Sequence, residues 1–250
     1  MDEIAGTLSR KKPLNGFHLK MIAVVCMVID HSVWLFVPVN SVASVGFFLR
    51  CLGRITFPIM AFFIAEGYRH TSNVKKYLTR LGIFALISIL PFQLFFNGTQ
   101  WQIPNNVFIT LFLGLFSLHL TDRIKDSMGR LIVVMLCSIA SSLGDWSVVG
   151  VPMIYLFGRI QDPKKRIVYS ISIFVLLYLI SHFIEYLMGS VFYPAYLTVF
   201  GAFLAIPLLL NYNGERGPSN GFTKYLFYWF YPLHLLVFMI IRYLTMGPWF

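Results

Sequence analysis

Long apolar runs alternate with short polar connections along the whole chain. Nine such runs fall at 17–38, 43–66, 81–97, 105–121, 131–144, 147–158, 167–187, 191–211 and 225–243. A helix needs about 20 apolar residues to cross the hydrocarbon core of a bilayer. The pattern therefore predicts an all-α polytopic membrane protein, a bundle of about nine transmembrane helices. The two shortest runs flank the turn GDWS, and they fit either two short spans or a re-entrant pair.

The composition also indicates a membrane protein. Of the 250 residues, 58% are hydrophobic and 12% are charged, whereas about 25% charged residues is typical of soluble domains. We expect one transmembrane domain over residues 1–250, in the plasma or inner membrane, with the lipid bilayer around it. The net charge of +10 does not indicate nucleic acid as a partner, because the basic residues form short clusters between apolar runs. Such clusters set topology and contact lipid headgroups.

The positions of the basic residues predict the orientation of the chain. All but three of the 20 Lys and Arg residues fall in the N-terminal segment and in every second connection after it. Connections rich in Lys and Arg stay in the cytoplasm. We therefore predict a cytoplasmic N-terminus and a C-terminus on the outside. The three exceptions lie within apolar runs and are Arg50, Arg54 and Arg242.

Ionisable side chains at membrane depth are the candidates for a functional site. A charge at the bilayer centre costs at least about 2.5 kcal/mol, so such residues are rarely placed there without a role. Asp30 and His31 follow Lys20 by ten and eleven residues, which puts them about 15 Å into the membrane at 1.5 Å per residue. Arg54 and His234 reach a similar depth. We expect one polar layer in which Asp30 pairs with Arg54 while His31 stays free; a structural ion pair with buried histidines is the alternative.

The step from Lys20 to His31 predicts an elongated anionic ligand. Eleven residues make about three helical turns, so the two side chains face nearly the same way. Coenzyme A has a matching shape, with phosphates at one end and a thioester at the end of an extended arm. We expect its phosphates to bind five basic residues on the cytoplasmic side: Lys20, Arg69, Lys75, Lys76 and Arg80. The alternative is that these basic residues only set the topology of the chain in the membrane.

His31 is the predicted general base, because a neutral imidazole accepts a proton from an amine or hydroxyl that attacks a thioester. In the last run, Tyr231 and His234 are three residues apart and share a helix face, and Pro232 between them is expected to bend the helix. We expect Arg54 and His234 to orient the reactants or to stabilise the oxyanion. The three cysteines lie inside apolar runs and show no metal-ligand spacing, so we expect no metal.

Four segments carry a resemblance to a known family. They are LKMIAVVCMVIDH from residue 19, the long block at 52–84, GDWSVVGVPMIYLF at 144–157 and FYPLHLL at 230–236. In this order they resemble the TraX family, known for acetylating the N-terminus of pilin subunits. The resemblance implies a membrane acyltransferase that uses acetyl-CoA, with motif positions at Asp30, His31, Arg54, Glu66 and His70.

A looser resemblance is to the acyltransferase-3 family, whose first helix carries an arginine, ten residues and then a histidine. Here Lys20 stands in the place of that arginine, which keeps the charge but loses the bidentate geometry for phosphate. Arg50 and Arg54 correspond only weakly to the paired arginines of that family, because their spacing differs.

The sequence leaves the acceptor open, since a pilin, another peptide, a glycan and a lipid are all compatible with it. It also leaves two alternatives of other classes. A proton-coupled or solute transporter would use the layer of Asp30, His31 and Arg54 as a relay. A scaffold for a membrane complex would need that layer for assembly only. The oligomeric state is not predicted.

Overall fold

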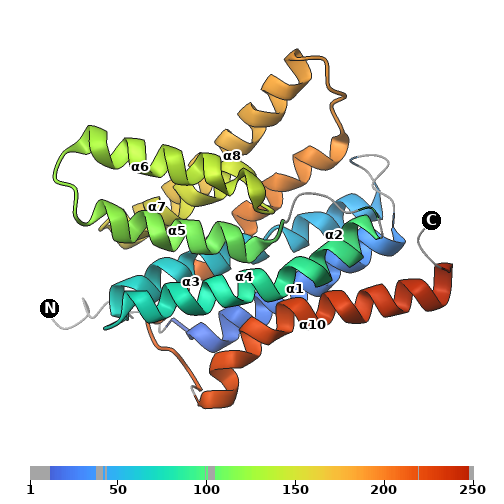
Figure 1. Ribbon diagram of the computed structural model, residues 1–250, viewed down its shortest axis with the longest axis horizontal. Helices are drawn as coiled ribbons and strands as arrows, with labels where there is room; N and C mark the ends of the chain where they lie inside the picture. The colour runs from blue at the N-terminus through green and yellow to red at the C-terminus, as the bar shows by residue number, and fades with distance from the viewer. Residues whose placement is uncertain are drawn as a thin grey trace, which may run out of the picture.

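The structure is a computed structural model that describes residues 12–37, 42, 44–98, 100, 105–218 and 220–247. Helices dominate this part of the chain (Figure 1). The α-helices and 3-10 helices (η) are α1 (Gly16–Phe36), α2 (Val45–Gly53), α3 (Thr56–His70), α4 (Val74–Asn97), α5 (Val107–Thr121), α6 (Ser127–Ala140), η1 (Ser141–Leu143), η2 (Ser147–Val149), α7 (Gly150–Arg159), α8 (Pro163–Leu187), η3 (Pro194–Leu204), α9 (Ala205–Leu210) and α10 (Gly221–Met246).

Five helical segments are long and apolar enough to cross a membrane: Gly16–Phe36, Val45–His70, Val74–Asn97, Pro163–Leu187 and Tyr225–Thr245. Shorter apolar helical segments lie at Val107–Thr121, Ser127–Leu143, Ser147–Arg159 and Pro194–Leu210. Together these segments overlap the nine predicted apolar runs, so the all-helical prediction is confirmed for the described residues. The number of crossings and the side on which each terminus lies stay predictions.

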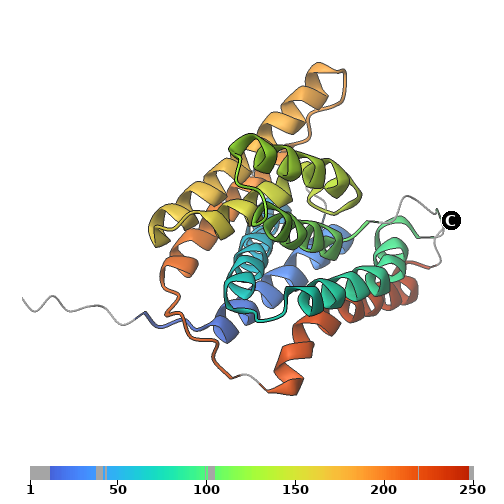
Figure 2. The same ribbon diagram turned by 60° about the vertical axis from the view of Figure 1, so that its left-hand side comes forward.

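The helices form two groups that meet at α3 and where α4 packs against α5. In the first group, α1 packs against α2 and α10, and α4 packs against α10. In the second group, α5 packs against α6 and α7, and α7 packs against α8. Helix α3 contacts α1 on one side and α5 and α7 on the other, so it lies at the centre of the bundle (Figures 1 and 2). The C-terminal half of α8 projects beyond the other helices.

The second apolar run is broken into two helices at Arg54 and Ile55. Gly53, directly before the break, lies against α1, where a Cβ atom on this glycine would sit 2.4 Å from the Cβ of Asp30. On the other side of the break, the Thr56 hydroxyl donates a hydrogen bond of 3.0 Å to the carbonyl of Ala23 in α1. The break and these contacts set the register between α1 and the α2–α3 segment.

The tip of the α6–α7 hairpin reaches the interior of the bundle. The backbone N–H of Asp145, in the turn between η1 and η2, donates to the carbonyl of Asn106 at 3.4 Å. Asn106 is fully buried, accepts from the N–H of Phe108 and donates its own amide N–H to the Ala85 carbonyl at 2.9 Å. Hydrogen bonds through Asn106 therefore connect the hairpin tip, the start of α5 and α4 inside the protein.

The close approach of α1 and α2 generates a stability prediction. We expect Gly53→Ala to destabilise the protein by about 1–3 kcal/mol, because the new methyl group meets Asp30 and the helices must separate. Gly82→Ala in α4 is the matched control, since its nearest contact there would be an ordinary 3.6 Å to Phe112. Thermal unfolding in detergent measures both. Equal melting temperatures for the two variants would contradict the packing described here.

Candidate functional site

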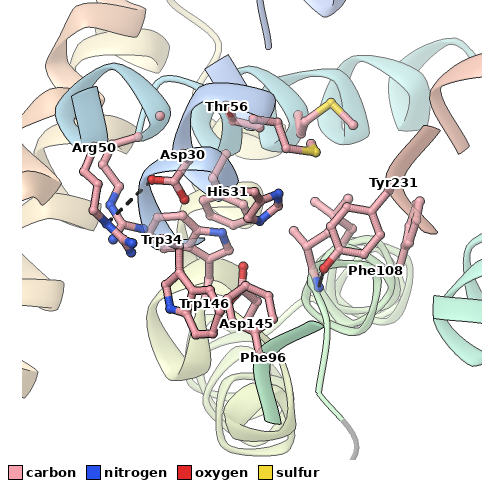
Figure 3. A pocket seen from close by; sticks show the side chains of 17 residues that line it. Asp30, His31, Trp34, Arg50, Thr56, Phe96, Phe108, Asp145, Trp146 and Tyr231 are labelled. Atoms are coloured by element: carbon pink, nitrogen blue, oxygen red, sulfur yellow. Dashed lines mark hydrogen bonds and ion pairs between the residues drawn. The ribbon is translucent and has the colours of Figure 1, made fainter. Parts of the chain in front are cut away.

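A cavity lies between α1, the α2–α3 break, the start of α5, the α6–α7 turn and α10 (Figure 3). Aromatic side chains make up much of its wall, among them Trp34, Phe57, Phe96, Phe108 and Trp146. Its polar lining is formed by Asp30, His31, Arg50, Arg54, Thr56, Asp145 and Tyr231. The cavity therefore gathers the predicted residues Asp30, His31, Arg54 and Tyr231 from three separate parts of the chain.

A hydrogen-bond chain fixes which nitrogen of His31 carries the proton. The Nδ1 atom of His234 lies 2.9 Å from the Phe230 carbonyl, which can only accept, so this nitrogen carries a proton and donates. In a neutral ring, the Nε2 atom of His234 must then accept, and it lies 2.7 Å from the Nδ1 atom of His31. His31 Nδ1 is therefore the donor, and its Nε2 atom keeps a free lone pair.

His31 and His234 occupy different positions relative to the cavity. His31 lines the cavity, whereas His234 lies behind it and stacks on the Phe230 ring at 4.8 Å between ring centroids. Both histidines are buried. Tyr231 and His234 share a face of α10 as predicted, with their rings 5.6 Å apart. The arrangement makes His31 the available base and His234 the residue that orients it.

Asp30 pairs with a different arginine from the one predicted. The Nε atom of Arg50 lies 3.7 Å from Oδ1 of Asp30. Arg54 instead donates from Nε to the Thr198 hydroxyl at 3.2 Å, and its guanidinium lies over the Trp146 ring at 5.2 Å. The predicted Asp30–Arg54 ion pair is therefore wrong, because the break after Gly53 turns Arg54 toward η3 and the α6–α7 turn.

Asp145 is a cavity residue that sequence reasoning did not select. It belongs to the turn GDWS between the two shortest apolar runs, and the hairpin tip carries it to the cavity, where it is an exposed residue of the lining. Although the residue is open to the cavity, the protein around it shields it from bulk water, and this desolvation raises the pKa of Asp145 to about 6. The charge of Arg54 acts in the opposite direction. Its signal in the sequence is its place between glycine and tryptophan in a very short connection.

Tyr231 supplies a hydrogen-bond donor to the cavity. Its hydroxyl oxygen accepts the backbone N–H of Val107 at 3.5 Å. This contact uses the oxygen, so the hydroxyl proton is available for a group inside the cavity. Tyr231 is itself buried and lines the cavity beside Phe108.

A second cavity adjoins the first on the side of Lys20. Lys20 lines it, with its Nζ atom 4.9 Å from the centroid of Phe63. Met60, Phe108 and Leu111 line both cavities, so these three side chains form the wall between them. Lys20 and His31 therefore lie on one helix, and each lines one of two adjoining cavities.

Of the other predicted phosphate-binding residues, Arg80 lies nearest to this second cavity. Its guanidinium lies 5.1 Å from the ring centre of Tyr77 and 5.0 Å from that of Tyr228, and both tyrosines line the cavity. Lys75 and Lys76 are exposed in the first turn of α4 and do not line it.

Arg69, Glu66 and His70 lie outside both cavities. Arg69 Nη2 donates to three carbonyls at the end of α7, at 3.0–3.1 Å, which belong to Phe157, Gly158 and Ile160. Glu66 accepts from Arg166 Nη1 at 3.1 Å and lies 3.7 Å from Arg69. These contacts tie α3 to α7 and α8, while His70 is exposed at the end of α3.

Comparisons with known proteins match most of the length of the chain. A family model described as "TraX protein" matches residues 15–242. The chain belongs to the TraX family. A probable fimbrial assembly protein FimC, serogroup H1, of Dichelobacter nodosus is 30% identical over 247 residues, which cover 91% of this chain and 96% of that relative. No solved structure gives a significant match.

The TraX match covers both cavities, because their lining residues run from Lys20 to Tyr231. The family and the apolar helices together make this chain a multi-pass membrane protein. The family model confirms the resemblance that the four sequence segments predicted.

Two aspartates in this TraX-family chain should show opposite pH effects on stability. Because the pKa of Asp145 is raised above its unfolded value, the folded state binds more protons between about pH 4 and 6, and stability falls as pH rises through this window. Burial acts to raise the pKa of Asp122, but hydrogen bonds from Tyr68 and Arg159 lower it overall. Its contribution to stability is therefore lost as pH falls.

Thermal unfolding of Asp145→Asn between about pH 4 and 7, and of Asp122→Asn below about pH 5, measures this difference. Relative to the unsubstituted protein, Asp145→Asn should gain stability as pH rises, and Asp122→Asn should lose it. The same trend in both variants would contradict the electrostatics of the cavity.

Proposed function

We propose that this protein is a membrane-embedded acyltransferase that moves an acetyl group from acetyl-CoA to an amine or hydroxyl of an acceptor. The observation that carries the proposal is the hydrogen-bond chain that leaves Nε2 of His31 as a base beside a cavity. A second cavity with a cation, Lys20, adjoins it. A base in one cavity and a cation in the adjoining cavity fit a thioester whose far end carries anionic phosphates.

The donor would enter from the side of Lys20. Its phosphates would meet Lys20 and Arg80, and the aromatic rings near them offer a stacking surface for the adenine. The extended arm would then pass Met60, Phe108 and Leu111 to reach His31. The eleven-residue step spans about 16 Å along the axis of α1, which suits the extended arm of coenzyme A.

The transfer itself needs one base and one set of hydrogen-bond donors. The acceptor attacks the thioester carbon, a C–N or C–O bond forms, and Nε2 of His31 takes the proton that the acceptor loses. The carbonyl oxygen becomes an oxyanion, which the hydroxyl of Tyr231 and the guanidinium of Arg50 or Arg54 would stabilise. The C–S bond then breaks, and the proton passes from His31 to the thiolate of CoA. His234 positions His31 throughout.

The relative suggests the kind of acceptor. Its name describes a fimbrial assembly protein, so a fimbrial subunit is the acceptor we place first, modified while it is still in the cell membrane. The polypeptide N-terminus of such a subunit offers an amine, and its side chains offer hydroxyls. We expect acetyl-CoA as the donor substrate, without a metal.

Loss of the base tests the chemistry. We expect His31→Ala to lower kcat by at least about 100-fold, because it removes general base catalysis, while acetyl-CoA still binds. The assay is transfer of radiolabelled acetyl to a peptide with the N-terminal sequence of the host's fimbrial subunit, by protein in liposomes. His119→Ala, on α5 and away from both cavities, is the control. Full transfer by a folded His31→Ala protein would refute the assignment.

Binding of the donor tests the path through the two cavities. Lys20→Ala and Arg80→Ala should raise the Kd for CoA by about tenfold each, since a charge-assisted contact contributes roughly 1.5–3 kcal/mol. Lys75→Ala should leave it unchanged, because Lys75 is exposed and outside the cavities. Calorimetric titration of the purified protein with CoA gives these constants. No CoA binding, together with solute flux in liposomes, would favour a transporter instead.

A further inference from the structure

We propose that Asp145 binds the attacking amine of the acceptor as an ammonium ion and takes its first proton before the amine attacks the thioester. The inference rests on the proposed acyltransferase function and adds a proton-accepting residue to it. Its basis is the set of polar groups that face one another across the cavity.

Asp145 is presented to the cavity by the tip of a helix hairpin. The turn that carries it is held by the hydrogen bond from its backbone N–H to the Asn106 carbonyl and by the neighbouring Trp146, which stacks on Phe57 at 4.7 Å. Figure 3 shows the Asp145 carboxylate directed into the cavity, toward the side on which His31 lies. Within the described part of the chain, no side chain forms a hydrogen bond or ion pair with this carboxylate.

The two arginines of the cavity are engaged elsewhere. Arg50 forms its ion pair with Asp30, and Arg54 bonds Thr198 and lies over Trp146. Their charges favour the ionised carboxylate through space, but desolvation opposes them more strongly and keeps the pKa of Asp145 raised. The titratable and charged groups that surround Asp145 are Asp30 and His31 on α1, Arg50 and Arg54 around the helix break, Tyr178 on α8 and Tyr231 on α10.

The unused hydrogen-bond capacity of the cavity favours an occupant rich in donors. Three acceptors have no hydrogen-bond partner among the described residues, although Oδ1 of Asp30 forms the ion pair with Arg50: the Asp145 carboxylate, Oδ1 of Asp30 and Nε2 of His31. An ammonium ion brings three N–H donors, whereas a hydroxyl brings one. The ammonium charge also offsets the carboxylate of Asp145. An amine acceptor therefore satisfies the cavity better than a hydroxyl acceptor does.

The proton balance assigns one step to each base. The acceptor enters as an ammonium ion and gives one proton to Asp145, which frees the nitrogen lone pair. The amine then attacks the thioester carbon, the C–N bond forms, and His31 takes the second proton. When the C–S bond breaks, His31 returns that proton to the CoA thiolate. The proton on Asp145 leaves through the cavity to water, so each turnover releases one proton in addition to CoA.

The test compares two acceptors and two substitutions. One probe is the N-terminal peptide of the host's fimbrial subunit; the other is the same peptide with a hydroxyl in place of the α-amine. Asp145→Asn is compared with Asp126→Asn, at the N-cap of α6 in the same hairpin, where asparagine also caps a helix. Transfer by protein in liposomes is followed as CoA release, and CoA affinity is measured on the same preparations.

We expect Asp145→Asn to lower kcat/KM for the amine peptide by about 100-fold, the scale of one proton-transfer group, and to change the hydroxyl peptide by less than about threefold. CoA affinity and the Asp126→Asn variant should stay unchanged. An equal loss of kcat/KM for both peptides, or no loss for the amine peptide, would overturn the role of Asp145 but not the proposed function. An unsubstituted protein that neither binds CoA nor releases it from acetyl-CoA would overturn the proposed function itself.

Discussion

The hydrogen bond between His31 and His234 joins α1 to α10, the first and the last of the described helices in the sequence. It is short, buried, and continued by the bond from His234 to the Phe230 carbonyl. This chain leaves one nitrogen of His31 unprotonated and pointing away from His234. The base of the proposed reaction therefore depends on α10 lying against α1, although the two helices are separated by most of the sequence.

Around this bond, the protein holds four charged side chains in an otherwise apolar bundle. Burying a charge costs free energy unless the charge is paired or solvated. The charged side chains here are stabilised in different ways. Asp30 pairs with Arg50, Arg54 contacts Thr198 and Trp146, and Asp145 opens onto the cavity. Irregular backbone at the α2–α3 break and at the α6–α7 turn presents these groups. Irregular backbone inside a membrane protein is stable where it lines a cavity.

Much of the bundle could be predicted from the sequence because hydropathy reports directly on helices in lipid. The counting of residues from Lys20 also placed His31 and Arg54 at one depth, and both line the same cavity. The depth of a residue in the membrane, however, does not specify in which direction around the helix axis its side chain points. The break after Gly53 turned Arg54 away from Asp30, and the one proline of that run, Pro58, lies in the first turn of α3 and not at the break.

Asp145 and Arg69 show the same limit in other ways. For the turn at Asp145, two short spans and a re-entrant pair stayed open, because apolar length alone does not tell how far a short hairpin reaches. The phosphate-binding role of Arg69 stays a prediction, because a basic cluster has the same sequence pattern whether its members bind a ligand or cap a helix. In the structure it caps α7 through three carbonyls. Such partners come from distant segments, which only the tertiary structure brings together.

The state of the His31 ring tests the central claim most directly. Nitrogen NMR of protein labelled with ¹⁵N-histidine in lipid bilayers, assigned with His31→Gln and His234→Gln, reports which nitrogen carries the proton. We predict a neutral His31 at pH 7, protonated on Nδ1, with a hydrogen-bond coupling to Nε2 of His234, and loss of this single tautomer in His234→Gln. A proton on Nε2 of His31, or a doubly protonated ring at that pH, would contradict the account.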